Sequence, residues 1–253
     1  MSVVPTDEWL QKSFDDPVEM LERTKRGKGA GEAFYEYLRK QGMYRPSRQM
    51  KERINELKDA ELWGKVSSFE KKYKKKWKGP DVPIYIFPIE SRAGFFRAST
   101  KKSGVCFPDE IFLFFQTLEN EKEYEALFVH EYHHCTRMKR LGKKEEEYTL
   151  LDSIVFEGLA ENAVREYCGI DYVAPWTEKY TEEDVTGWFG EWIKPSLELT
   201  RKDALHDELL HGKGKYPNLL GYAAGYQIVR TFMEKNGINS VKAMGLPSSV
   251  FLK

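Results

Sequence analysis

The sequence predicts an α+β fold that is mainly helical, with a small mixed β-sheet packed on a central helix. Two apolar runs that contain proline, residues 82–89 and 104–115, have the composition of strands. Most of the remaining chain spaces its apolar side chains at helical intervals. With 253 residues, 41% of them hydrophobic, the chain is long enough to bury a substantial core.

Residues 1–80 are predicted to form a helical N-terminal extension to one compact domain of residues 81–253. Helical patterns cover residues 17–26, 32–41 and 47–75, and none of them carries recognisable chemistry. A lysine-rich run, 71–78, has aromatic residues between its lysines and is followed by Gly-Pro. Such a run is usually a solvated helix end whose charges complement the helix dipole. The alternative is a basic adaptor surface that binds phosphate or an acidic partner.

The two predicted strands lie directly before the central helix. Residues 82–89 are bounded by proline and are expected to form the first strand. Residues 104–115 are expected to form the second, with Pro108 at a position that an edge strand tolerates. Its last five residues, Ile111 to Phe115, are apolar enough to be buried.

The central helix is predicted over residues 121–141. Asn120 is a suitable N-cap with Glu123 at the third helical position, and Gly142 is a typical helix stop. Basic residues in the last turn complement the helix dipole. Along one side run apolar and motif residues: Tyr124, Leu127, Phe128, Glu131, His134, Cys135 and Met138.

This helix contains the motif His-Glu-x-x-His, with His130, Glu131 and His134. Each helical residue advances by about 100°, so the two histidines lie one turn apart and can present two imidazole nitrogens to one metal ion. Glu131 lies about 100° round from His130, where it can reach a water on that metal rather than bind the metal itself. The motif is typical of zinc hydrolases. The alternative is an exposed histidine-rich helix, or core histidines that bind backbone groups.

A second helix is predicted over residues 150–168, with Thr149 as a possible cap. Glu157 and Glu161 lie one turn apart on it, and Gly158 allows a close approach to a neighbouring backbone. Because catalytic zinc takes three protein ligands and keeps one open position, we expect Glu157 to be the third ligand. Glu161 would accept the ring N–H of a ligating histidine, although the two roles could be exchanged. Two solvated glutamates are the alternative.

These residues resemble the gluzincin metalloproteases, in which the third ligand is a glutamate on a second helix and an acid one turn later supports a ligand histidine. More closely, the chain resembles a bacterial family of predicted Zn-dependent proteases, classed as a domain of unknown function. The resemblance implies a zincin-like fold, in which substrate lies antiparallel to an edge strand. The strand directly before the central helix could play that part, or it could be a core strand with no role in substrate binding. Phe156 stands where thermolysin has asparagine, so that enzyme's substrate contacts are not implied. Four segments carry the closer resemblance: 107–109, 130–134, 157–161 and 221–226.

Beyond the second helix, the chain turns irregular as far as residue 215 and is rich in tryptophan. The aromatic residues could form a lid, or they could pin a loop to the core. His206 and Asp207 are either a supporting pair or surface residues.

Two residues are candidates to stabilise a developing oxyanion. His211, next to Gly212, could donate a hydrogen bond to it. A final helix, predicted over residues 218–236, offers Tyr226 as the other candidate, although tyrosines at helical spacing are usually core residues. In the same helix, Gly221 and Gly225 lie one turn apart and predict close packing against a neighbour.

Charge and composition restrict the partners. The chain has 40 basic and 40 acidic residues, so no global field favours nucleic acid or an anionic membrane. Residues 1–14 show no signal-peptide pattern, and no apolar run approaches the roughly 18 residues of a membrane span. The three cysteines are best read as reduced thiols. We therefore expect a cytoplasmic protein with no nucleic-acid or membrane partner.

Taken together, the residues predict a zinc metallopeptidase that binds one zinc ion through His130, His134 and Glu157. Glu131 would act as general base toward the attacking water, with His211 or Tyr226 as oxyanion donor. The substrate would be a peptide or protein. The alternative function is a zincin-fold binding or sensing module that retains zinc but turns over little. The sequence leaves open the physiological substrate, endo- or exopeptidase action and the oligomeric state.

Overall fold

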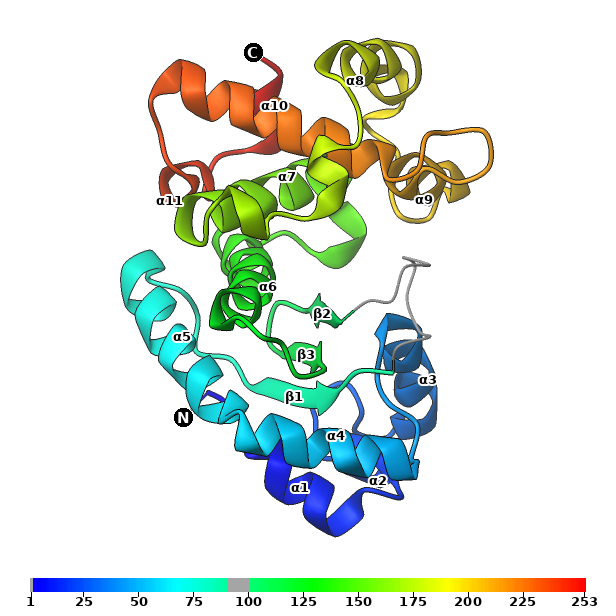
Figure 1. The fold of residues 1–253 in the computed structure, drawn as a ribbon. Coiled ribbons are helices and arrows are strands. Elements are labelled where there is room, and N and C mark those ends of the chain that lie inside the picture. Colours follow the sequence, from blue (N-terminus) through cyan, green and yellow to red (C-terminus); the bar gives the residue numbers. More distant parts are fainter. Residues whose placement is uncertain (1, 91–100) are drawn as a thin grey trace. The chain divides into compact units, whose positions relative to one another are not determined.

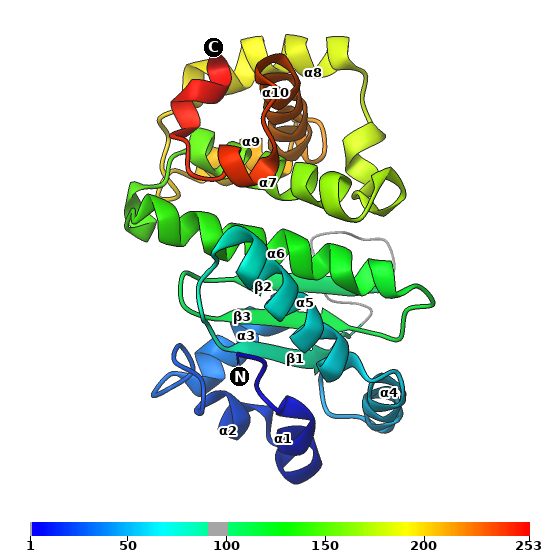
Figure 2. The same cartoon turned by 90° about the vertical axis from the view of Figure 1, so that its left-hand side faces the viewer.

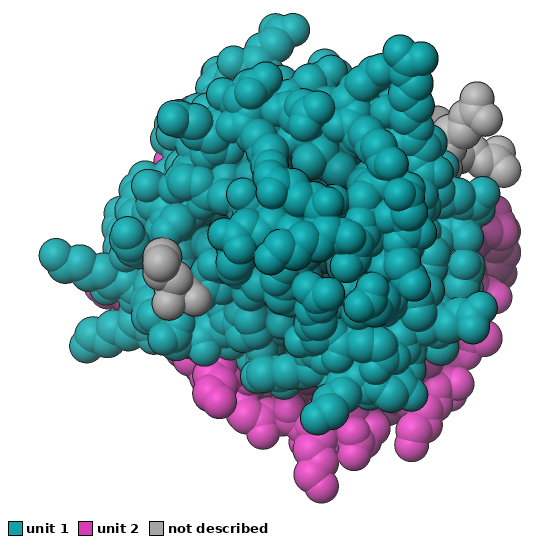
Figure 3. All heavy atoms as spheres, turned by 90° about the horizontal axis from the view of Figure 1, so that it is seen from below, with its two compact units in different colours: residues 1–135 teal, residues 136–253 magenta. Residues whose placement is uncertain are grey.

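The computed structural model describes residues 2–90 and 101–253. The chain divides into two compact units, Met1–Cys135 (unit 1) and Thr136–Lys253 (unit 2), coloured teal and magenta in Figure 3. Helices predominate in both units, and one three-stranded sheet lies in unit 1. The predicted α+β class with a small mixed sheet is therefore confirmed.

The sheet has the strand order β1-β3-β2, with β1 (Ile84–Pro88) parallel and β2 (Lys102–Cys106) antiparallel to β3 (Ile111–Phe115). The prediction of a single strand over 104–115 is wrong. Pro108 lies in the turn of a hairpin, which the N–H of Phe107 closes by donating to the carbonyl of Glu110 at 2.9 Å. The strand directly before the helix with the His-Glu-x-x-His motif is thus β3, the central strand, and β2 is an edge strand of the sheet.

The two faces of the sheet meet different helices. The aromatic side chains of Phe112 and Phe114 share a core with α1 (Thr6–Ser13), α2 (Pro17–Leu21), α3 (Gly31–Gln41) and α4 (Arg48–Asp59). On the opposite face, the ring of Phe115 lies 5.2 Å from that of Tyr124 in α6 (Glu121–Leu141). In Figures 1 and 2 the strands accordingly lie between α6 and the helices α1, α2 and α4. The sheet therefore supports the helix that carries the His-Glu-x-x-His motif.

The N-terminal helices differ from the predicted ones in two places. Residues 47–75 form two helices, α4 and α5 (Leu62–Trp77), because Glu61 between them adopts a left-handed conformation with φ of 53°. The helix predicted over 17–26 ends at Leu21, whose carbonyl accepts a hydrogen bond from the Thr24 hydroxyl at 2.7 Å. In addition, α1 had not been predicted.

The lysine run at the end of α5 binds acidic side chains of unit 1. Lys72 donates to Glu125 at 2.5 Å, and Lys74 pairs with Glu70 at 3.3 Å and Asp81 at 3.0 Å. These pairs favour the helix-end interpretation over a basic adaptor surface.

The helix α6 has the predicted bounds, 121–141. Its N-terminus is capped as expected, since the Asn120 side-chain oxygen accepts from the N–H of Lys122 at 2.9 Å. At its C-terminus, Gly142 has the left-handed φ of 60° that favours glycine. The helix runs continuously from unit 1 into unit 2.

Unit 2 is built on α7 (Leu150–Tyr167) and α10 (Leu220–Asn236), shown in Figure 1. They meet backbone to backbone at two glycines. A Cβ atom on Gly158 would lie 2.1 Å from the carbonyl oxygen of Gly225, and one on Gly225 would lie 2.0 Å from that of Ile154. The close approach predicted for these glycines is therefore confirmed, and any side chain there would force the helices apart.

The ends of these helices agree with the sequence within two residues. Thr149 and Asp152 form a capping box at the start of α7, which ends one residue before the predicted end. By contrast, α10 begins two residues late, because Leu219 has a left-handed φ of 61°. The stretch that looked irregular contains α8 (Glu182–Trp188) and α9 (Ala204–His211), and a short α11 (Ser240–Ala243) follows α10.

Candidate metal centre

His130 and His134 form the histidine pair that the motif predicted. Both side chains are partly buried, and their Nε2 atoms lie 3.0 Å apart. A zinc ion with tetrahedral ligands at about 2.0–2.1 Å separates two nitrogens by roughly 3.3 Å. The pair is therefore close to the separation that zinc requires, although two neutral imidazoles in a direct hydrogen bond would also lie this close.

His133, between them in the motif, faces elsewhere. Its side chain is fully buried, and its ring meets Trp77 of α5 edge-on with centroids 5.7 Å apart. The difference follows from helical geometry, because His133 is rotated by about 100° from His134. Only two of the three clustered histidines are thus available as a pair of metal ligands.

Glu131 faces the edge strand β2. Its side chain is 7% exposed, and a Cβ atom on Gly104 would lie 2.5 Å from its Cγ and 2.7 Å from its Oε1. Gly104 therefore leaves the space that the carboxylate occupies. Gly104 is not one of the site residues predicted from the sequence. A glycine inside a predicted strand is a general signal of close approach, but it does not say which residue approaches.

In unit 2, α7 carries the two candidate glutamates in different environments. Glu157 is partly buried, whereas Glu161 is 3% exposed. One oxygen of Glu161 accepts the backbone N–H of Ala174 at 2.5 Å. Glu161 thus helps to fix the segment that follows α7.

His211 ends α9, where Gly212 follows in the left-handed conformation. Burial lowers the pKa of His211 below its usual value and outweighs the opposite effects of Asp207 and Glu157. At pH 7 the imidazole is therefore mainly neutral and can donate one hydrogen bond. The negative charge of Glu157 is one of the effects that raise the pKa of His211.

Tyr226 has a more enclosed position on α10. It is 4% exposed and its ring meets that of Trp176 at 6.3 Å. Burial raises the pKa of its phenol, while Arg165 and Arg230 act in the opposite direction. The carboxylate of Glu161 also raises the pKa of Tyr226. Both His211 and Tyr226 therefore stay candidates for the oxyanion donor.

His206 is buried rather than on the surface. Its Nε2 lies 3.0 Å from the hydroxyl oxygen of Ser153 in α7, and its Nδ1 lies 2.9 Å from a carboxylate oxygen of Asp207. Serine, histidine and aspartate are thus hydrogen-bonded one after another, as in a hydrolase triad. However, Ser153 is 5% exposed and lies within a helix, where a substrate cannot reach it. The contact instead ties α9, which carries His211, to α7, which carries Glu157.

One group of three histidine, cysteine or acidic side chains in residues 2–90 and 101–253 could hold a metal ion: His130, His134 and Glu157. Two imidazole nitrogens and one carboxylate oxygen fit zinc, which accepts both kinds of ligand in catalytic sites.

None of the helices in the described part of the chain, residues 2–90 and 101–253, combines the length and apolarity needed to cross a membrane.

Comparisons with known proteins agree with this chemistry. The model of a family described as "Predicted Zn-dependent protease (DUF2268)" matches residues 62–253. The chain is 35% identical over 261 residues to "Uncharacterized protein YjaZ" of Bacillus subtilis (strain 168), which covers 100% of this chain and 98% of the relative. It is 26% identical over 136 residues to "Uncharacterized protein YjfC" of the same organism, across 50% of this chain and 45% of that one. No solved structure matches.

Proposed function

Because the chain belongs to the family of predicted Zn-dependent proteases, we propose that it is a zinc-dependent peptidase of gluzincin type. His130, His134 and Glu157 would hold one zinc ion in a zincin-like site. The observation that carries the proposal is the pair of Nε2 atoms 3.0 Å apart on α6, with the buried carboxylate of Glu131 one residue along. The cytoplasmic location and the division at residues 80 and 81 stay predictions.

In the proposed mechanism the protein supplies a base and a hydrogen-bond donor. Zinc, when bound, would polarise the peptide carbonyl and lower the pKa of water to about 7. Glu131 accepts a proton from the attacking water and passes it to the leaving amine. His211, or alternatively Tyr226, donates a hydrogen bond to the developing oxyanion.

The peptide or protein substrate would lie along β2. The central strand β3 is paired on both sides and fully buried, so its main chain is not available to a peptide. By contrast, within residues 2–90 and 101–253, β2 is paired with β3 on one side only, and it is partly buried throughout. An extended peptide could therefore add to this edge through main-chain hydrogen bonds, close to Glu131.

The test of the proposed function is metal content together with peptide hydrolysis by the purified protein. We expect about one zinc ion per chain and cleavage of a mixed peptide library that a chelator abolishes and added zinc restores. Zinc without cleavage would point to the binding or sensing module. A protein that binds no metal would contradict both functions.

The two glutamates of α7 should differ in their effect on zinc affinity. Glu157→Gln removes a proposed ligand. Glu161→Gln alters a group that would support a ligand, and the loss of such a group typically lowers metal affinity by roughly 10- to 100-fold. We therefore expect Glu157→Gln to weaken zinc binding more, as measured by competition with a chromophoric chelator. The reverse order would identify Glu161 as the third ligand.

Gly104 should matter for activity but not for metal binding. In the variant Gly104→Ala, the new Cβ would overlap the Glu131 side chain and displace the carboxylate, while His130 and His134 stay in place. We expect kcat to fall and zinc content to remain unchanged. Gly64→Ala is the matched control, because nothing lies within 4 Å of a Cβ there. Equal kcat values for the two variants would show that Gly104 does not position Glu131.

A further inference from the structure

A buried arginine follows the proposed metal ligands on α6. Arg137 is fully buried, and its Nη1 donates to the carbonyls of Met244 at 2.8 Å and Leu246 at 3.0 Å. Its Nη2 donates to the hydroxyl of Ser248 at 3.0 Å. Burial lowers the pKa of the guanidinium to about 10, so it remains charged at pH 7. A buried charge is costly unless it is well paired, which makes these contacts more than incidental packing.

Ser248 links this arginine to an acidic residue at the start of α7. Its hydroxyl accepts from Arg137 and donates to Asp152 Oδ1 at 2.5 Å. The other oxygen of Asp152 accepts from Lys143 at 2.8 Å and from the N–H of Thr149 at 3.2 Å. Burial alone would raise the pKa of Asp152, but these hydrogen bonds lower it below its usual value. Both ends of the Arg137–Ser248–Asp152 chain are therefore charged at neutral pH.

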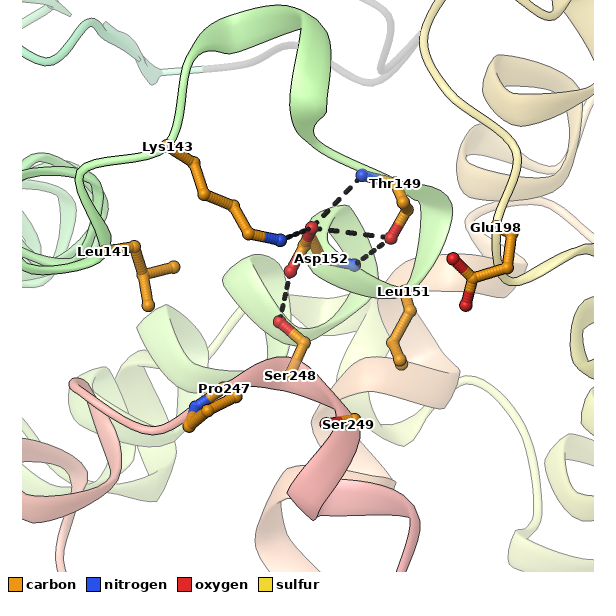
Figure 4. A pocket seen from close by; sticks show the side chains of 9 residues that line it. All are labelled: Leu141, Lys143, Thr149, Leu151, Asp152, Glu198, Pro247, Ser248 and Ser249. Carbon is orange, nitrogen blue, oxygen red and sulfur yellow. Dashed lines mark hydrogen bonds and ion pairs between the residues drawn. The ribbon is translucent and has the colours of Figure 1, made fainter.

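Figure 4 shows the Asp152 end of this chain in the wall of a pocket of about 330 Å³. The side chains of Lys143, Thr149, Asp152 and Ser248 point toward one another there, rather than into open space. Their polar groups are engaged in mutual hydrogen bonds. This arrangement is suited to holding the hydrogen-bonded chain Arg137–Ser248–Asp152 together.

The hydrogen-bonded chain Arg137–Ser248–Asp152 connects the two helices that carry the proposed ligands. Arg137 is three residues after His134 on the continuous helix α6, and Asp152 is in the first turn of α7, which carries Glu157. The guanidinium also lies 5.1 Å from the ring of Phe156, the residue before Glu157. Residues 244–248 thus hold the end of one ligand helix and the start of the other.

We propose that residues 244–248 act as a clasp that sets the position of α6 relative to α7 for metal binding, with Ser248 as a positioning residue. This inference rests on the proposed function of the three ligands. Metal sites require their ligands to be held within about 0.5 Å of the productive geometry. Two rigid helices joined near the ligands meet this requirement, because a small change at the clasp moves whole ligand side chains.

The test is the zinc affinity of the full-length variant Ser248→Ala, measured by chelator competition. We expect its Kd for zinc to rise by roughly 2- to 30-fold, the range typical of changes in a packed network that does not contact the ligand directly. Thermal unfolding of the metal-free protein provides the second readout. The conservative variant Ser248→Thr keeps the hydroxyl and should retain most of the affinity. Ser240→Ala is the control, because it removes another buried serine hydroxyl of unit 2 outside the clasp.

The outcomes separate this inference from the proposed function. A raised Kd in Ser248→Ala but not in Ser240→Ala supports the clasp. If Ser248→Ala only lowers the unfolding temperature and keeps the wild-type Kd, Ser248 is merely structural and the clasp is wrong. If Ser248→Ala does not fold, Asp152→Asn takes its place with the same expected result. Failure of the wild-type protein to bind zinc would contradict the proposed function itself, and the clasp with it.

Discussion

Glu131→Gln is expected to separate catalysis from metal binding. Glutamine keeps the size and the hydrogen-bonding capacity of the side chain, but it cannot accept a proton from the attacking water. Peptide hydrolysis should therefore fall by roughly 100- to 10,000-fold, the loss expected of a general base. Zinc content and thermal stability should stay near those of the wild type, because Glu131 is not a proposed ligand. The measurements are kcat/KM on a cleaved peptide and zinc per chain.

A matched control exists on the same helix. Glu121→Gln makes the same chemical change at an exposed position in the first turn of α6 and should leave kcat/KM unchanged. Unaltered activity in Glu131→Gln would contradict the general-base role and assign the activity to another site or to a contaminant. A sensing module would instead tolerate Glu131→Gln with its partner binding intact.

His130→Ala and His134→Ala are each expected to abolish zinc retention. Loss of one of three protein ligands leaves a site in which water competes effectively for the metal. Zinc per chain, measured after dialysis against a mild chelator, should fall from about one to near zero, and peptide hydrolysis should be lost with it. Stoichiometric zinc in either variant would show that α6 does not hold the metal through this pair.

His133→Ala provides the internal comparison. The ring of His133 is fully buried against Trp77, so its removal leaves a cavity in unit 1 and should lower the unfolding temperature. Zinc retention should persist, because His133 faces away from the proposed site. His130→Ala and His134→Ala would then lose zinc, whereas His133→Ala would keep zinc and lose stability. A general loss of structure would not produce this difference between neighbouring histidines.

The helices that carry the proposed ligands could be located from sequence because their ends depend on nearby residues. Asn120 and Gly142 limit α6 through hydrogen bonds and backbone conformation within one turn, and Thr149 does the same for α7. Helical periodicity then places Glu157 and Glu161 on one side of α7. Interactions of this range leave a direct pattern in the sequence.

The errors arose where backbone conformation or pairing overrides composition. The apolar run 104–115 has strand composition throughout, but the turn at Pro108 folds it back into β2 and β3. The run 47–75 is helical in composition, but the left-handed Glu61 divides it. The composition of a segment indicates which secondary structure it prefers. The point at which the backbone turns within that segment depends on what the residues before and after the turn pack against.

By itself, the sequence determined the chemistry that this protein can offer: two histidines one turn apart with Glu131 between them, and a second helix with two acidic residues. Only the tertiary structure decided which side chains surround that chemistry. The contacts of Gly104 with Glu131 and of Ser248 with Arg137 join residues far apart in the chain. Such contacts depend on how helices and strands pack, and no local pattern specifies them, because hydrogen bonds within one turn fix an element but not its neighbours.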